Sequence, residues 1–128
     1  MSLQVFDEHQ ALCYLVQLTD SDGTTPKYIT QGPGTGARID QLTLVSTSVS
    51  AAEVRVSLNS AADIIMCTVA VPAGAGMSSA VPAVDVVPLL TPVLAGLVLA
   101  PGVSLYVAVV VALGAGETLN AIALGGTF

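Results

Sequence analysis

Apolar and polar residues alternate with a period of two along most of the chain, a pattern that predicts β-strands rather than helices. The stretch Glu53–Asn59 shows it most cleanly, because positions 54, 56 and 58 are apolar and positions 53, 55 and 57 are polar. A strand of this kind packs one face on a core and leaves the other face in water. We therefore expect a protein built from β-sheets.

Turns rich in Gly, Pro, Asp and Ser divide the chain into about eight short antiparallel strands at roughly ten-residue spacing. This spacing predicts an all-β fold, a jelly roll or β-sandwich in a single domain spanning residues 1–128, with a closed barrel as the alternative. Residues 1–10 precede the first strand and are a candidate N-terminal arm. The predicted strands are Ala11–Leu18, Lys27–Thr30, Arg38–Ser46, Glu53–Asn59, Ile64–Val71, the irregular edge strand Val81–Val87, Leu105–Leu113 and Thr118–Leu124.

Alternation also assigns side chains to faces in two of these strands. In the third strand, positions 42, 44 and 46 share one face, and Arg38 and Asp40 are expected on that same face nearer the preceding loop. The strand ending at Leu113 is apolar on both faces, so it should be central in the domain or in an oligomer. Leu89–Leu94 is expected to form a single turn of helix.

The segment Val86–Gly116 contains no charged side chain, yet it does not predict a membrane span. A spanning helix needs roughly 20 apolar residues that can all remain helical. Three prolines and two glycines between positions 88 and 102 interrupt this segment, and no Lys or Arg stands near either end to anchor it. The segment is therefore expected to form part of a sheet, with no membrane as partner.

Composition makes the surface unusual, with 53% hydrophobic residues, 9% charged residues and a mean hydropathy of +0.81. An average domain of this length would carry about 32 charged residues, whereas this chain carries 12 (three Lys or Arg and nine Asp or Glu). Apolar and small polar residues must then form much of the surface. Surfaces of that kind are usually covered by copies of the chain or by a partner.

Charge restricts the partners further. A net charge of −6 with three basic residues argues against nucleic acid and against an anionic membrane surface. Asp7 and Glu8 stand where a secretory signal would have its basic and apolar regions, so we expect synthesis and folding in a cytoplasm. Cys13 and Cys67 both lie in apolar runs and are expected as buried free thiols rather than a disulfide or metal pair.

Candidate chemistry is sparse, and we predict no enzyme and no catalytic, cofactor-binding or metal-ligating residue. His9 is the only histidine, and with Asp7 and Glu8 it is expected to be a solvated segment rather than a metal or acid–base site. Asp20–Gly23 resembles part of a calcium loop but is expected to be a turn, and Gly32–Gly36 lacks the Lys and helix of a phosphate-binding loop. The aromatic residues, at 4%, are expected as core or interface anchors.

Several turn and strand segments occur in a familiar order along the chain: Asp22–Thr24, Lys27–Thr30, Gly34–Leu44, Ser46–Ser48, Val71–Gly76, Leu99–Val107 and Ala123–Phe128. This order resembles a group of small virion proteins of tailed bacteriophages. The resemblance covers roughly residues 20 to 128 and rests on turn-and-strand patterns rather than on chemical motifs.

The resemblance implies a jelly-roll-like capsid decoration (cement) protein on the outside of an assembled phage head. Such proteins form homotrimers that bind the major capsid protein at three-fold junctions, so the expected location is the capsid surface of the virion. We further expect Ser104–Leu113 and part of Val81–Leu99 at or near the contact between subunits. The alternative is a fibre-base or adhesion module that binds a host surface or attaches a fibre. A polysaccharide hydrolase is a third class, disfavoured by the lone histidine and the shortage of paired carboxylates.

Overall fold

The structure is a computed structural model that describes residues 11–32, 34, 36–58, 64–90 and 97–127. Strands dominate it, as the alternation predicts. Its elements are β1 (Ala11–Thr19), η1 (Asp20–Asp22), β2 (Lys27–Gln31), β3 (Ala37–Ser46), β4 (Ala52–Leu58), β5 (Ile64–Val71), β6 (Val84–Asp85), α2 (Val87–Leu90), β7 (Leu97–Leu99), β8 (Ser104–Val109) and β9 (Thr118–Thr127).

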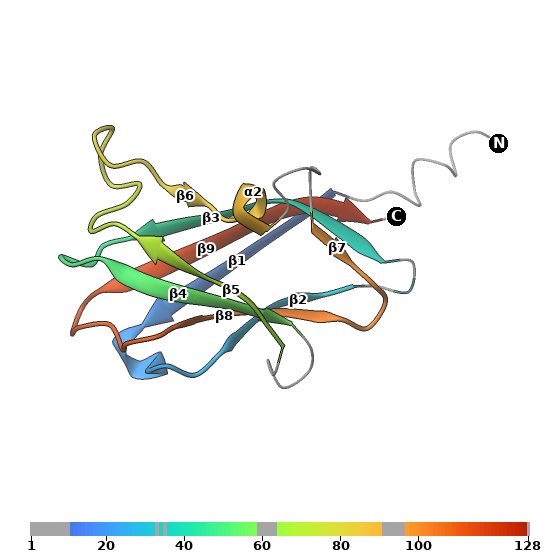
Figure 1. Cartoon of the computed structure of the whole chain (residues 1–128), viewed down its shortest axis with the longest axis horizontal. Helices are drawn as coiled ribbons and strands as arrows, with labels where there is room; N and C mark the ends of the chain where they lie inside the picture. The colour runs from blue at the N-terminus through green and yellow to red at the C-terminus, as the bar shows by residue number, and fades with distance from the viewer. Residues whose placement is uncertain (1–10, 33, 35, 59–63, 91–96, 128) are drawn as a thin grey trace.

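Two antiparallel sheets pack against each other as a β-sandwich (Figure 1). Sheet A has the order β1-β9-β3-β6, and β7 also pairs with β3, whereas sheet B has the order β2-β8-β4-β5. The predicted all-β, jelly-roll-like sandwich is therefore confirmed, and the sheets remain separate rather than closing into one barrel. β8 is an inner strand of sheet B, as its two apolar faces predict.

Alternating side chains from both sheets fill the space between them. In β3, β4 and β8 the residues that turn inward, which alternate except at a bulge in β3, are nearly inaccessible to water. Burying a Val or Leu side chain contributes roughly 1.5–3 kcal/mol relative to leaving it exposed, so this shared layer holds the two sheets together. Its largest fully buried members include Ile39, Leu42, Leu44, Val54, Val56, Leu105, Val107 and Leu119.

The expected faces at the beginning of β3 are wrong. Arg38 and Asp40 are exposed, whereas Ala37 and Ile39 are fully buried on the side where Leu42 also lies. A register shift opposite β9, between positions 39 and 41, gives β3 one extra residue. Such a bulge reverses the alternation locally, which a count by twos along the sequence cannot detect.

Ser57 of β4 was expected on the wet face, yet it is only 2% exposed. Its register against β8 is regular, so it keeps the side that alternation predicts, and the bulge opposite it has its extra residue in β5, between Ile65 and Cys67. Ser57 stands directly opposite Tyr106 of β8, and a small side chain beside a large ring loses most of its access to water. Position 59, the predicted end of this strand, lies outside the described residues.

The uncharged segment is covered mainly by its own chain. Val86, Leu99, Leu105 and Val107 are fully buried in the sandwich. β8 ends at position 109 instead of 113, and Val111 is 76% exposed in the loop that follows. β9, in contrast, runs to Thr127, three residues further than predicted.

The segment between β5 and β7 is also more broken than the sequence suggests. The predicted edge strand Val81–Val87 is reduced to β6, which pairs with β3 at the edge of sheet A. The short helix α2 then begins at Val87, two residues before the expected start, with Pro88 in its first turn, where a missing N–H costs nothing. Positions 91–94 of the expected turn lie outside the described residues. In the part of the chain that the structure describes, no helix has the length and apolar character to cross a membrane.

Gly125 marks the closest approach of two backbones in sheet A. A Cβ built at this position would overlap the carbonyl oxygen of Arg38 on β3. We predict that Gly125→Ala destabilises the protein by about 1–3 kcal/mol, because the paired strands must separate. Thermal unfolding measures the loss. Gly34→Ala is the control, since a Cβ there meets no atom within 4 Å, and an equal effect of both changes would contradict the explanation.

Candidate interaction surfaces

Much of the outward side of sheet A carries no charged residue, and we call this uncharged part the sheet A face. The exposed ion pair of Arg38 and Asp40 borders it at the start of β3. Both β1 and β9 lack charged residues along their entire length. Leu15 is 72% exposed and Leu124 is 37% exposed, with half-buried Ile122 directly opposite Leu15 in the register. The sheet A face consists of Cys13, Leu15 and Gln17 from β1, Asn120, Ile122 and Leu124 from β9, and Gln41, Thr43 and Val45 from β3.

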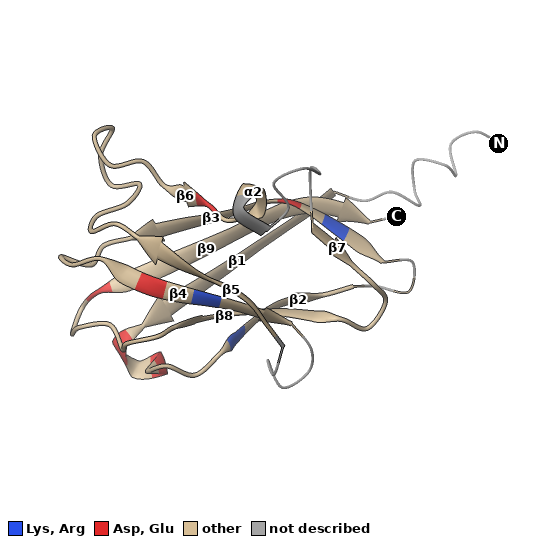
Figure 2. Cartoon of the chain, viewed as in Figure 1, with Lys and Arg blue, Asp and Glu red and all other residues tan. Residues whose placement is uncertain are grey.

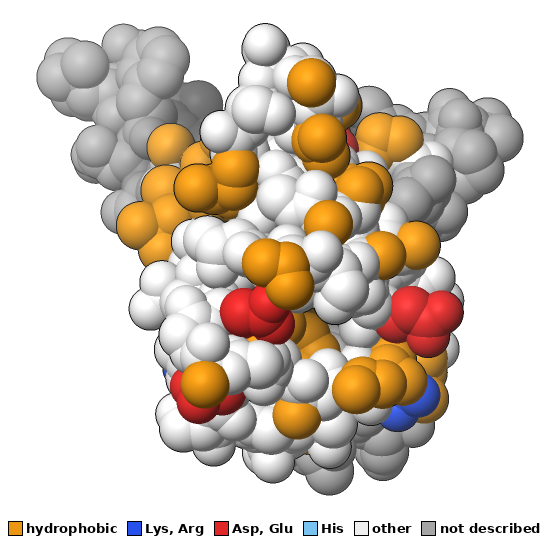
Figure 3. All heavy atoms as spheres, turned by 90° about the vertical axis from the view of Figure 1, so that its left-hand side faces the viewer, with side chains coloured by type: hydrophobic (Ala, Val, Ile, Leu, Met, Phe, Trp, Pro, Cys, Tyr) orange, Lys and Arg blue, Asp and Glu red, His pale blue; other side chains and the backbone are white. Residues whose placement is uncertain are grey.

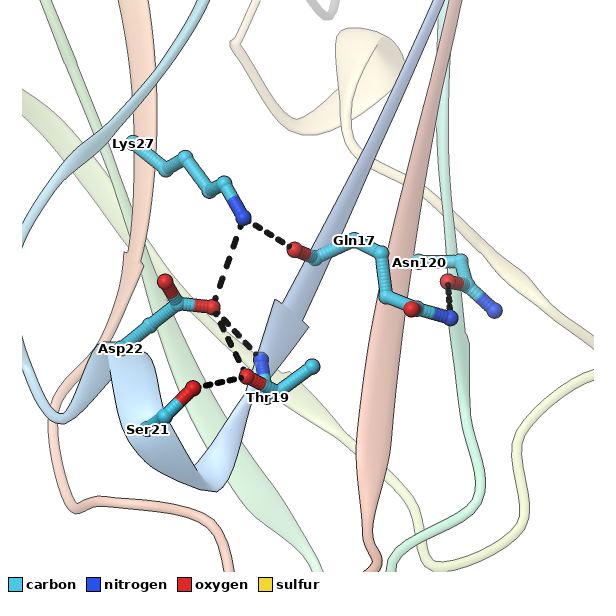
Figure 4. A network of polar contacts seen from close by, with 6 residues as sticks. All are labelled: Gln17, Thr19, Ser21, Asp22, Lys27 and Asn120. Atoms are coloured by element: carbon cyan, nitrogen blue, oxygen red, sulfur yellow. Dashed lines mark hydrogen bonds and ion pairs between the residues drawn. The ribbon is translucent and has the colours of Figure 1, made fainter.

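A shallow depression lies in the middle of this face. Leu15, Gln17, Asn120 and Ile122 contribute to its lining. Gln17 Nε2 donates a hydrogen bond to Asn120 Oδ1 at 3.0 Å, which fixes the two amides beside the apolar side chains (Figure 4). The depression offers apolar contact area with one polar border, and its lining carries no ionisable group.

The cysteines lie differently from the expectation. Cys13 is exposed on the sheet A face, because the odd-numbered residues of β1 point outward. Cys67 on β5 is partly exposed, and its partial burial raises the pKa of its thiol. Both are free thiols, as predicted, but neither is fully buried.

A second uncovered surface is the end of the sandwich where three connections meet, which we call the loop end (Figure 3). It comprises residues 47–51, 72–83 and 110–117, and its most exposed apolar residues are Val49 (88%), Met77 (59%) and Val111 (76%). Hydrophobic side chains are spread over this end among polar atoms, with few charges between them. A hollow between the first and third of these loops is lined in part by Val49, Ala51, Val111 and Glu117.

Glu117 fixes the two loops that border this hollow. Its Oε2 accepts a hydrogen bond from the N–H of Val49 at 3.0 Å, and its Oε1 accepts one from the N–H of Gly114 at 2.8 Å. These two donors hold the pKa of the Glu117 carboxyl below its ordinary value. The carboxylate therefore has a structural use, as a connector between loops.

Asp22 has a similar structural use at the turn after β1 (Figure 4). Its Oδ2 accepts hydrogen bonds from the N–H of Thr19 at 2.8 Å and from Thr19 Oγ1 at 3.2 Å, and Lys27 Nζ lies 3.5 Å away. The N–H of Thr19, helped by the Lys27 ammonium, holds the pKa of Asp22 below its ordinary value. Lys27 Nζ also donates to the carbonyl oxygen of Gln17 at 2.8 Å. The segment expected to be a turn is a turn stabilised by its own side chains.

The remaining candidates from the sequence do not converge on a site. The segment with Asp7, Glu8 and His9 lies outside the described residues, and within those residues no three His, Cys, Asp or Glu side chains gather as they would around a metal ion. Gly32 packs on the turn around Ala100, where an added Cβ would overlap the Ala100 carbonyl oxygen. Among the described residues, the charged ones are spread thinly over strands and connections (Figure 2).

Two aromatic residues pack against each other on the outside of sheet B. The rings of Tyr28 and Tyr106 are 5.8 Å apart at an interplanar angle of 70°. This edge-to-face arrangement is a favourable one for aromatic pairs.

The surfaces on sheet A and at the loop end were not predicted from the sequence, although the apolar residues at alternate outward positions of β1 were a usable signal.

No known protein family, curated protein or solved structure matches this chain.

We predict that Glu117 makes stability depend on pH. Because its pKa is lowered in the folded state, its contribution is fully present above the ordinary value of 4.5 and is lost as pH falls through the folded value. The wild type should therefore unfold at a higher temperature than Glu117→Gln at neutral pH, and this difference should disappear in acid. Glu53→Gln, an exposed change on β4, is the control. A difference between wild type and Glu117→Gln that stays constant across the acid range would contradict the prediction.

Proposed function

We propose that this chain is a structural virion protein that decorates and stabilises the assembled head of a tailed bacteriophage. In this proposal it binds the major capsid protein from outside, as a homotrimer at three-fold junctions. The resemblance in turn-and-strand order suggests the class, and the uncharged sheet A face is the single observation that supports it most. Leu15, Ile122 and Leu124 expose apolar area there on two strands that contain no charged residue.

A protein that clamps a shell needs contact area and rigidity rather than chemistry. The sandwich supplies rigidity through its continuous core, and short loops connect most of its strands. The sheet A face and the loop end supply contact area with little charge to desolvate, which favours association because burying unpaired charge is costly. Both surfaces are thus suited to contact with protein.

The structure also changes which residues we assign to the contact. Ser104–Leu113 was expected there, but residues 104–109 form β8, and Leu105, Val107 and Val109 are buried within the chain itself. From this segment, Tyr106 on the outside of sheet B and the loop that contains Val111 remain available. We therefore assign the subunit and capsid contacts to the sheet A face and the loop end.

Stabilisation of the head follows from mass action. A protein that binds the assembled shell and not its separated subunits lowers the free energy of the assembled state by its binding free energy. Each bound copy contributes independently of the others, so many weak contacts add up over a shell. This mechanism requires neither a cofactor nor a reacting group.

Copy number and position on the particle test the proposal. We predict that cryo-electron microscopy of the phage whose genome carries this gene shows the chain on the outer surface of the head. It should be present in hundreds of copies that follow the capsid lattice. Particles assembled without the gene should lack this density and open at lower temperature. Absence from the head would contradict the proposal, and a few copies at one vertex or on the tail would favour the fibre-base alternative.

A further inference from the structure

We propose that β1 is an edge for self-association, at which two copies of the chain pair through antiparallel β1 strands. The two-fold axis passes at Cys13, and the pairing joins two copies of sheet A into one continuous sheet. This inference goes beyond the decoration function and does not depend on it.

The direction of the backbone groups in β1 follows from two hydrogen bonds. The Thr19 N–H donates to Asp22 Oδ2, and the Gln17 carbonyl oxygen accepts from Lys27 Nζ, so both residues turn backbone groups away from β9 (Figure 4). In an antiparallel strand, the N–H and C=O of one residue point to the same side, and the side alternates from residue to residue. Ala11, Cys13 and Leu15 therefore also turn their N–H and C=O groups outward, away from β9.

The other end of the same ladder agrees with this assignment. The Thr118 N–H and C=O bond to Thr47, next to β3, so even-numbered residues of β9 face β3 and odd-numbered ones face β1. Leu18 stands opposite Leu119 in the register, which makes even-numbered residues of β1 the partners of β9. The N–H and C=O groups of the odd-numbered residues of β1 therefore point to the open edge of sheet A.

β1 lacks the devices that protect the other outer strands. Proteins blunt exposed strand edges with charges, bulges or very short strands, because an open edge pairs readily with another chain. β6 has two residues, and the Asp85 carboxylate accepts the Leu42 N–H beside it. β2 carries Lys27 and a bulge, and β5 is bulged against β4. β1 instead has nine residues in unbroken register with β9 and contains no charge and no proline.

The protected end of β1 selects the register of the pairing. Lys27 and Asp22 occupy the outward groups at positions 17 and 19, which leaves positions 11, 13 and 15 open among the described residues. A two-fold axis at Cys13 places Ala11 opposite Leu15 of the other copy and uses all three positions, with about two hydrogen bonds for each pair. An axis at Leu15 would place Ala11 opposite Thr19, whose N–H is already bonded to Asp22.

A second copy of the chain suits this edge because the two-fold axis pairs β1 with the β1 of the other copy, so both strands have the same charge. Like charges directly opposite each other destabilise a strand pair, and β1 has no charge although the whole chain has a net charge of −6. The pairing also sets the exposed Leu15 beside the other copy and extends the apolar sheet A face across the axis. Because it joins chains in pairs, it is compatible with a trimer formed through another surface and would then connect neighbouring trimers.

Site-specific cross-linking tests both the contact and its register. In a Cys67→Ser background, Cys13 is the only thiol, and the two Cys13 Cβ atoms should lie about 5 Å apart across the axis. A short bifunctional maleimide should therefore give a covalent dimer on a denaturing gel. Leu15→Cys, in a background without Cys13 and Cys67, is the matched control. Its two thiols should be offset by about 13 Å along the strands and should cross-link poorly.

Two further experiments make the outcome decisive. A mixture of the Ala11→Cys and Leu15→Cys chains, both without native cysteines, should cross-link where neither does alone. Leu15→Pro removes an N–H at the open edge without breaking the β9 ladder, and Leu15→Lys places a charge in the paired edge, opposite Ala11 of the other copy. Each should reduce Cys13 cross-linking at least tenfold in a chain that circular dichroism shows to be folded. Absence of the Cys13 dimer, equal cross-linking at positions 13 and 15, or undiminished cross-linking in folded Leu15→Lys would overturn the proposal.

Discussion

The pairing of β9 with β1 on one side and β3 on the other is the interaction on which the rest of the structure depends. Thr118–Thr127 runs in antiparallel register with both neighbours over nearly its full length, and Gly125 permits the closest backbone approach. This three-stranded arrangement fixes which residues of β1 point inward to the core and which point to solvent. It also fixes which backbone groups of β1 remain at the open edge, so packing and surface properties have the same origin.

Three carboxylates among the described residues organise backbone in the sandwich. Asp85 accepts N–H groups beside β6, Asp22 accepts the Thr19 N–H after β1, and Glu117 accepts N–H groups from two loops. Carboxylates engaged in this way are strong local connectors, because hydrogen bonds to a charged acceptor are stronger than neutral ones. Little charge then remains to cover the sheets, which explains how a chain with so few charged residues exposes a wide apolar face.

The order and approximate bounds of most strands could be predicted from the sequence, because turns and alternation are local signals, whereas the three-residue strand β7 was not predicted. The bulges at positions 39–41 and 65–67 could not, because they depend on the register against a partner strand. For the same reason Arg38 and Asp40 were assigned to the wrong face, and the cover that Tyr106 gives Ser57 was not foreseen. The composition correctly predicted that the chain exposes an apolar surface with few charges. That surface was assigned to Val86–Gly116, but the chain itself buries much of this segment. The uncovered surface belongs instead to β1 and β9, whose outward positions become visible only once sheet A is assembled.

The central claim is that the uncharged surface of sheet A is a contact between protein chains. Sedimentation equilibrium of the purified chain at micromolar concentration tests it most directly, because the method gives the mass in solution without reference to shape. The account predicts an assembly whose mass is a multiple of 12.8 kDa. A single monodisperse species of 12.8 kDa across the whole concentration range would contradict it.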